Sequence, residues 1–418
     1  MSPQLQVNGW VKAAVVLSGS LFGLAAAAAT SQLLGSERIS INGGCGWDGE
    51  FYCAMLKGTV VPEPYSRRIL LPFLARQVSA DTLTGFWVVN VLSLAAVTIL
   101  AMYIAWKLRP EELRASLDAG LVPPLAVGAA FLSARNSFHI IATYPALTDA
   151  LGLLFLVGAI ALVVLPVPPR ARWVLIPICF LAPLSREQLA AVLAGALVLA
   201  GLMRLLPWLT ALSALAASLL GGAIALRQPH LGGAQPLRGT VKYWLDHDFG
   251  SWQGFFRFIV MVMLAFGPFL LVLGLARGWN RTALWIVSVA AIFTAISLFA
   301  GGDTDRILTP AGLLIVLAAS ISVTKNERAL LGLALLVAAY AVQQAPFARV
   351  GGDPVAWLTF FGLRVTTIDS VVHNGLVPLL IGLPIAVAGF ILLLAGGRQR
   401  SDPHSRVKAS HNLHEPPW

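Results

Sequence analysis

Charged residues are scarce in this sequence. Only 11% of the 418 residues are Asp, Glu, Lys or Arg, whereas 57% are hydrophobic. Soluble domains carry roughly 25% charged residues, so this composition excludes a water-soluble globular protein. Long polar stretches are also missing, which excludes a separate soluble domain. The net charge of +10 does not indicate nucleic acid as a partner, because Arg-rich runs interleaved with aromatic residues are absent as well.

Cysteine is rare too. The three cysteines are too few and too scattered for a structural metal site. Cys179 lies in an apolar run and is expected in the core. Cys45 and Cys53 flank Asp48, and a disulfide between them is expected if this part of the chain faces an oxidising compartment. Two separate thiols are the alternative.

Apolar runs long enough to cross about 30 Å of hydrocarbon recur from end to end. We therefore predict an all-α fold, a polytopic transmembrane helical bundle with about twelve spans (eleven to thirteen). The predicted spans are 11–34, 84–106, 119–134, 146–166, 173–184, 188–203, 207–226, 255–276, 282–300, 307–323, 329–345 and 375–395. The segment 173–184 is too short to cross alone, so we expect a tilted or broken helix packed within the protein.

The spans form one predicted domain. It covers residues 1–396, contains a first extracytoplasmic loop at 36–83, and is followed by a short disordered cytoplasmic tail at 397–418. The first span resembles a signal peptide, but its apolar stretch is long and many spans follow, so we predict a retained anchor.

Basic short connectors determine the expected orientation. The connectors at 169–172, 277–281 and 325–328 and the tail from Arg398 carry Lys or Arg, and the twelve-span topology puts them all on one side. By the positive-inside rule that side is cytoplasmic. The remaining ionisable clusters then face outward, to the periplasm or exterior of a bacterial-type inner membrane.

The first of these clusters is Gly46-Trp47-Asp48-Gly49-Glu50-Phe51-Tyr52. Two carboxylates two residues apart in a Gly-containing turn are expected to approach one reacting centre. One would accept a proton from an acceptor hydroxyl while the other orients a metal or the substrate. The aromatic neighbours, Tyr52 among them, favour partial burial and a role in function. A solvated loop is the alternative.

Paired arginines follow in the same loop. Arg67 and Arg68 open a segment, 66–78, that is typical of a short interfacial helix interrupted at Pro72. Guanidinium groups bind phosphate oxygens in a bidentate manner, so we expect the pair to hold a substrate phosphate. Contact with lipid headgroups is the alternative, and for Arg76 the two interpretations are equally good.

Three further clusters are candidates for substrate contacts. Tyr144 and Asp149 come before and at the start of an apolar helix, where helix capping behind Thr148 explains the acid equally well. Arg186 and Glu187 interrupt two apolar runs, either as a buried ion pair or, the interpretation that we favour, facing a reaction cavity.

The last cluster lies between two predicted spans. Asp303, Asp305 and Arg306 follow two glycines. Arg306 is a candidate phosphate ligand, and capping of the following helix explains the two acids nearly as well.

Together these stretches resemble the GT-C superfamily of integral-membrane glycosyltransferases. Asp48-Gly49-Glu50 matches the position of the acidic motif that its members carry in the first extracytoplasmic loop. The stretches 65–72, 144–149, 185–187 and 303–306 look like segments of bacterial relatives. No large soluble C-terminal domain of the oligosaccharyltransferase type follows the spans.

The resemblance implies an inverting transfer of a sugar from a polyprenyl-phosphate donor to a lipid, glycan or protein acceptor. Asp48 would be the general base and Glu50 a supporting acid, and Arg67, Arg68 and Arg306 would hold the phosphate. Membrane lipids are the other expected partners. No cofactor is predicted with certainty, and a divalent metal stays open because metal dependence varies in the superfamily.

Three other functions compete with this prediction. A transporter or flippase of a lipid-linked or anionic substrate is the main alternative, but such folds often show inverted repeats, which we do not find here. The polar residues also gather on one rim instead of crossing the midplane. A polymerase or ligase of lipid-linked glycans and a structural assembly partner are the remaining alternatives.

Overall fold

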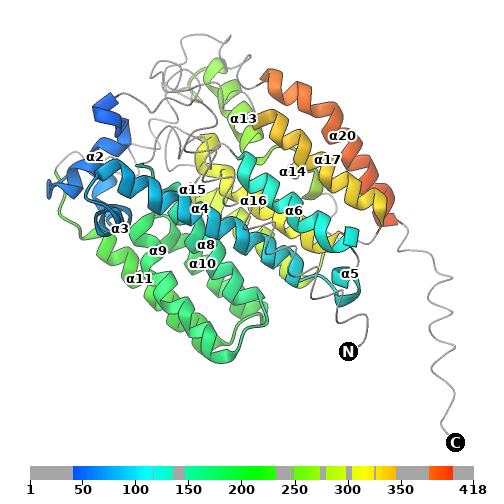
Figure 1. Ribbon diagram of the computed structural model, residues 1–418, viewed down its shortest axis with the longest axis horizontal. Helices are drawn as coiled ribbons and strands as arrows, with labels where there is room; N and C mark the ends of the chain where they lie inside the picture. Colours follow the sequence, from blue (N-terminus) through cyan, green and yellow to red (C-terminus); the bar gives the residue numbers. More distant parts are fainter. Residues whose placement is uncertain are drawn as a thin grey trace, which may run out of the picture.

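The described part of the chain is a bundle of α-helices (Figure 1). In this computed structural model the residues described are 41–115, 117–134, 146–231, 245, 249–273, 279–297, 304–323, 326–344 and 376–398. Among them the predicted all-α fold is confirmed, since extended pairing is limited to an isolated bridge between Pro62 and Leu231. The first predicted span, at 11–34, and the tail beyond Arg398 lie outside these residues.

Each predicted span after the first corresponds to a helix or a helix pair. The helices are α2 (Trp47–Leu56), α3 (Leu70–Val78), α4 (Thr82–Lys107), α5 (Glu111–Ala115), α6 (Leu117–Ser133), α8 (Asp149–Val164), α9 (Leu175–Ser185), α10 (Leu189–Leu202), α11 (Trp208–Leu226), α13 (Trp252–Phe266), α14 (Phe269–Val272), α15 (Arg281–Ser297), α16 (Thr304–Ser322), α17 (Glu327–Gln344) and α20 (Val377–Arg398). Short 3-10 helices are η2 (Ile41–Gly44), η3 (Tyr65–Arg67) and η4 (Pro169–Val174).

Three of the described helices are long and apolar enough to cross a membrane, namely α4, α11 and α20. Six further apolar helices are shorter, at 10–17 residues. The predicted number of about twelve spans therefore stays a prediction. The expectation for 173–184 is met in its local structure, because α9 has only 11 residues, follows η4 and packs against α8 and α11.

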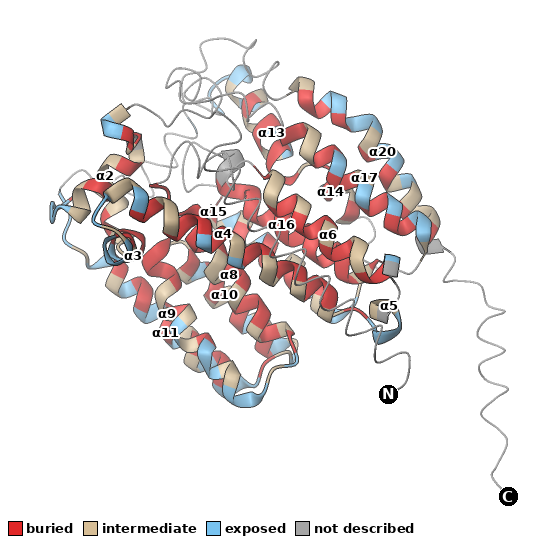
Figure 2. Ribbon diagram, in the orientation of Figure 1, coloured by how far each residue is buried: buried red, intermediate tan, exposed pale blue. Residues whose placement is uncertain are grey.

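The core centres on α16. Its residues from Ile307 onward are almost entirely buried, and it packs against α4, α6, α13, α14 and α15. Figure 2 shows the buried residues concentrated there, while exposed residues mark the outer helix α20. Large exposed apolar side chains on α20, such as Leu380, Ile381 and Ile391, suit an environment of lipid better than water. The α2–α3 pair lies at one edge of the bundle and the α17–α20 pair at the opposite edge (Figure 1).

The predicted span 255–276 is broken, which the apolar pattern did not indicate. The break lies between α13 and α14, where Gly267 adopts a positive φ of 54° and Pro268 follows. Proline lacks an N–H, so the carbonyl of Leu264 loses its helical donor. The side-chain amide of Gln344 on α17 supplies the missing bond, with Nε2 donating to Leu264 O at 2.9 Å. The buried Gln344 thus stabilises a helix break on a neighbouring helix.

Replacing this amide tests the role of the contact. We expect Gln344→Leu to lower the free energy of unfolding by about 1–3 kcal/mol, because a buried carbonyl is left without a donor. Thermal unfolding of the purified protein measures the change. Gln77→Leu, on an exposed position of α3, is the matched control and should be close to neutral. Equal stability of the two variants would contradict the assignment.

Candidate functional site

The two acids of the first cluster lie in a helix and not in a turn. Gly46, with a φ of 76°, ends the preceding segment, and α2 begins at Trp47, so Asp48 and Glu50 occupy its first turn. Residues two apart on a helix point about 200° away from each other. Accordingly, Asp48 Oδ1 accepts a hydrogen bond of 2.8 Å from the Tyr65 hydroxyl, whereas Glu50 accepts one from the Asn42 amide. The expectation that both carboxylates approach one centre is therefore not met.

A disulfide between Cys45 and Cys53 ties the segment before α2 to the middle of that helix. The predicted pairing is confirmed, and the alternative of two separate thiols is wrong. Gly46, at the N-cap position, has no side chain that could cap the helix. The covalent link instead holds the first turn of α2 in place.

Aromatic rings surround Asp48. The ring of Tyr65 stacks on Phe51 with a centroid distance of 4.4 Å and meets the edge of Tyr52 at 5.9 Å. Tyr52 is completely buried. Burial, followed by the charge of Asp48, raises the pKa of the Tyr65 phenol above its usual value, and burial also raises the pKa of Tyr52. Both hydroxyls therefore keep their protons over the physiological range.

Arg68 joins this aromatic group to the helix bundle. Its guanidinium donates to both carboxylate oxygens of Glu187, from Nε at 2.8 Å and from Nη2 at 2.9 Å, and its Nη1 donates to the Tyr52 hydroxyl at 3.0 Å. Burial alone would raise the pKa of Glu187, but the charge and hydrogen bonds of Arg68 outweigh it and lower this pKa to about 2. Burial acts to lower the pKa of Arg68, yet Glu187 raises it well above its usual value.

The neighbouring arginine, Arg186, makes a second ion pair. Its Nη1 donates to Asp149 Oδ1 at 2.8 Å, and the two side chains are only 6% and 5% exposed. Thr148 stands at the N-cap of α8 and makes no capping hydrogen bond through its side chain, whereas Asp149 lies in the first turn, where an acid is favourable to the helix dipole. Arg186 and Glu187 are thus paired with acidic or basic partners on other elements and not with each other.

The paired arginines of the first loop also diverge. Arg67 Nη2 contacts Glu63 at 2.5 Å, whereas Arg68 turns to Glu187. His230, after α11, lies with Nδ1 3.4 Å from the other oxygen of Glu63. Both arginines that were expected to bind phosphate therefore hold carboxylates of the protein.

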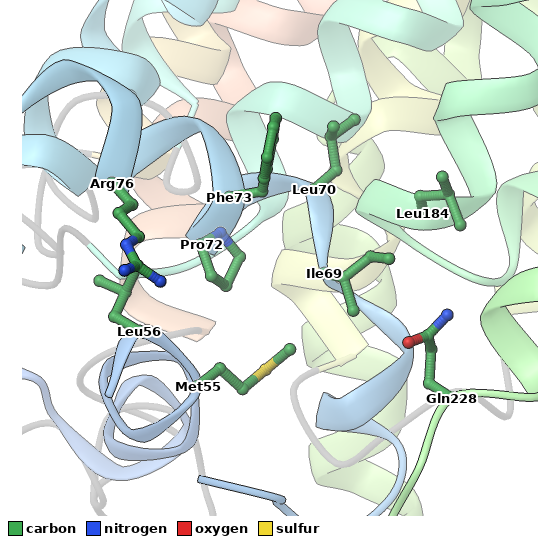
Figure 3. Close-up of a pocket in the computed structure, with 9 residues that line it drawn as sticks. All are labelled: Met55, Leu56, Ile69, Leu70, Pro72, Phe73, Arg76, Leu184 and Gln228. Atoms are coloured by element: carbon green, nitrogen blue, oxygen red, sulfur yellow. The ribbon is translucent and has the colours of Figure 1, made fainter. Parts of the chain in front are cut away.

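A pocket of about 470 Å³ opens beside these pairs (Figure 3). Arg76 and Gln228 are its polar lining residues, and the guanidinium of the exposed Arg76 reaches toward Leu56. The apolar lining residues come from α2, from α3 with the residue before it, and from α9: Met55, Leu56, Ile69, Leu70, Pro72, Phe73 and Leu184.

The helix α3 differs from its prediction at one point. It begins at Leu70, so Pro72 stands in its first turn, where no N–H is needed, and it does not interrupt the helix. Phe73 is 59% exposed and Val78 49% exposed, and Arg76 and Gln77 between them are exposed as well, so the position of α3 at a membrane interface stays a prediction.

One face of α2 connects Asp48 to the pocket. Asp48, Tyr52, Met55 and Leu56 recur at intervals of three and four residues and therefore share a side of the helix. The first carries the carboxylate and the last two line the pocket, roughly 10 Å further along the axis at 1.5 Å per residue. An acid and an apolar pocket that includes Arg76 in its lining thus lie along one side of the same helix, roughly 10 Å apart.

The remaining predicted residues are not placed. Tyr144 and Asp303 lie outside the described residues. The backbone of Asp305 and Arg306 forms the first turn of α16, but the structure does not describe their side chains. Within the described residues, no three His, Cys, Asp or Glu side chains come together as metal ligands.

The sequence interpretation missed two contacts of the site. They are the hydrogen bond from Tyr65 to Asp48 and the ion pair of Glu63 with Arg67. The spacing of Glu63 and Arg67, four residues apart in an otherwise apolar chain, was a usable signal for the second contact. Tyr65 lies 17 residues from Asp48, and nothing in the local pattern indicates that contact.

Comparison with known proteins adds no relative. A scan against models of protein families found no match, and a search of curated proteins found no significant similarity.

The Arg68–Glu187 pair predicts a specific dependence of stability on pH. Folding lowers the pKa of Glu187 from about 4.5 to about 2, so its contribution is complete above pH 4.5 and disappears as the pH falls toward 2. The contribution is on the order of 3 kcal/mol at 1.36 kcal/mol per pKa unit. Thermal unfolding between pH 6 and pH 2.5 should show this loss in the natural protein.

Two variants separate this effect from general acid denaturation. Glu187→Gln should remove this part of the pH dependence and lower stability at neutral pH. Glu112→Gln, exposed on α5, should change neither. An unchanged pH profile in Glu187→Gln would rule out the assignment.

Proposed function

We propose that the protein is a multi-pass membrane glycosyltransferase of GT-C type, which transfers a sugar from a polyprenyl-phosphate donor to a hydroxyl acceptor with inversion. The observation that carries the proposal is the shared face of α2, with Asp48 at one end and the Arg76-rimmed apolar pocket at the other. A molecule with a lipid chain, a phosphate and a sugar matches the order of the apolar pocket, Arg76 and Asp48.

The chemistry assigns one task to each part. The pocket receives the first units of the lipid chain, and Arg76 contacts the phosphate at its mouth. Asp48 accepts the proton of the acceptor hydroxyl as its oxygen attacks the anomeric carbon. The bond from that carbon to the phosphate oxygen breaks, and the polyprenyl phosphate leaves with the bonding electrons. The positive charge of Arg76 stabilises the departing phosphate.

Arg67 and Arg68 take a different role from the one expected. Because each holds a carboxylate of the protein, we assign them to the construction of the site and the phosphate to Arg76. Glu50 accepts a hydrogen bond from the Asn42 amide, and we assign it to supporting the first turn of α2.

The disulfide and the long apolar helices support a location for the proposed site. A disulfide persists in an oxidising compartment, so the pairing of Cys45 with Cys53 supports a site on the extracytoplasmic face of a bacterial-type inner membrane. The three long apolar helices support insertion in the bilayer.

Transport of a lipid-linked substrate is the second candidate function. The break between α13 and α14 favours it, because discontinuous helices often form the binding sites of transporters. An assay that measures both labelled product and movement of the intact lipid across a vesicle membrane separates the two functions.

Loss of the carboxylate tests the proposed reaction. Purified protein is incubated with radiolabelled polyprenyl-phosphate sugars and a panel of hydroxyl acceptors. We expect Asp48→Asn to reduce turnover by about 100- to 10,000-fold, the range for removal of a general base. Asp118→Asn, exposed at the start of α6, is the matched control and should retain activity. Turnover at the natural rate in Asp48→Asn would eliminate Asp48 as the base.

A further inference from the structure

The side chain of Tyr65 is held from three directions. Its ring stacks on Phe51 at 4.4 Å with an interplanar angle of 21°, and it meets Tyr52 edge-on at 5.9 Å. Its hydroxyl donates to Asp48 Oδ1 at 2.8 Å. Because two rings of α2 hold this ring, the position of the phenol oxygen is set by packing and not by the hydrogen bond alone.

Such a contact orients the carboxylate of Asp48. This residue lies in the first turn of a short helix at the edge of the bundle and is only partly buried. A short carboxylate there has several side-chain rotamers, and a catalytic base loses efficiency when its oxygen is displaced by even 1 Å. A hydrogen bond to a fixed phenol selects one orientation.

We infer that Tyr65 is the positioning residue for Asp48, which it orients by donating a hydrogen bond. This inference rests on the proposed function for its catalytic consequence, but the contact itself is testable without a substrate. No bond to Tyr65 forms or breaks during the reaction, and its phenol keeps its proton throughout.

The ionisable side chains neighbouring Asp48 make contacts of their own. Glu50 and Tyr52 lie on its own helix, and Glu50 bonds to Asn42. Arg68, after η3, turns its guanidinium to Glu187 and to the Tyr52 hydroxyl. On α3, Arg76 stands at the rim of the pocket.

The test compares two variants that each remove one phenol oxygen. Tyr65→Phe keeps the stacked ring, and Tyr103→Phe makes the same change on α4, where the ring packs beside Trp106. Infrared difference spectroscopy of protein with isotope-labelled aspartate, taken against Asp48→Asn, gives the stretching frequency of this carboxylate, which depends on the hydrogen bonds that it accepts. We expect Tyr65→Phe to shift this frequency, because the phenol donor is lost. Tyr103→Phe should leave it unchanged.

Incorporation of 3-fluorotyrosine at position 65 gives a second, independent variant. It keeps the ring and the hydroxyl, so folding is not at risk, and its more acidic phenol is a stronger donor. The carboxylate stretching frequency of Asp48 should therefore shift in the direction opposite to that in Tyr65→Phe. Equal frequencies in the natural protein and in both Tyr65 variants would overturn the inference.

Turnover distinguishes this inference from the proposed function. If the enzyme is active, Tyr65→Phe should lower kcat by about tenfold with little change in KM. A shifted carboxylate frequency in a protein that transfers no sugar would sustain the positioning role and refute the proposed function. An unchanged kcat in an active Tyr65→Phe enzyme would refute the positioning role alone.

Discussion

The bidentate contact between Arg68 and Glu187 is the interaction on which the site depends. The two residues are 119 positions apart, and their contact joins the layer formed by α2, η3 and α3 to the helix break between α9 and α10. Both are largely withdrawn from water, at 12% and 22% exposure, so either one alone would be an uncompensated charge. Through Tyr52, the same guanidinium also fixes the aromatic group that contacts Asp48.

Several buried polar groups in the described part of the chain lie where a helix stops or breaks. Arg186 and Glu187 follow the end of α9 and turn to different elements, one to Asp149 on α8 and the other to Arg68. At the break before Pro268, the side-chain amide of Gln344 donates to the Leu264 carbonyl and replaces the backbone N–H that proline lacks. In an interior with so little charge, each such group needs a partner, and the partners hold helices together at their least regular points.

Much of the fold could be predicted from the sequence, and much of the site could not. The apolar runs located every described helix from α4 onward except α5, because length and hydropathy are local properties. The break at Gly267 and Pro268 had a local signal, which the long apolar run obscured. The contact of Arg68 with Glu187 had none, since the choice of an ionic partner depends on how distant helices pack. The turn expected around Asp48 is instead the first turn of a helix, and this geometry sends Glu50 away from Asp48.

Exchange of the two charges tests the central contact most directly. Amide hydrogen exchange is followed in α2, which carries Asp48, and in α16, which lies in the core. The account predicts that Arg68→Glu and Glu187→Arg each speed exchange in α2 at least tenfold without affecting α16. The double variant, in which the pair is reversed, should restore most of the protection. Protection of α2 that is equal in all four proteins would contradict the claim that this ion pair holds the site on the bundle.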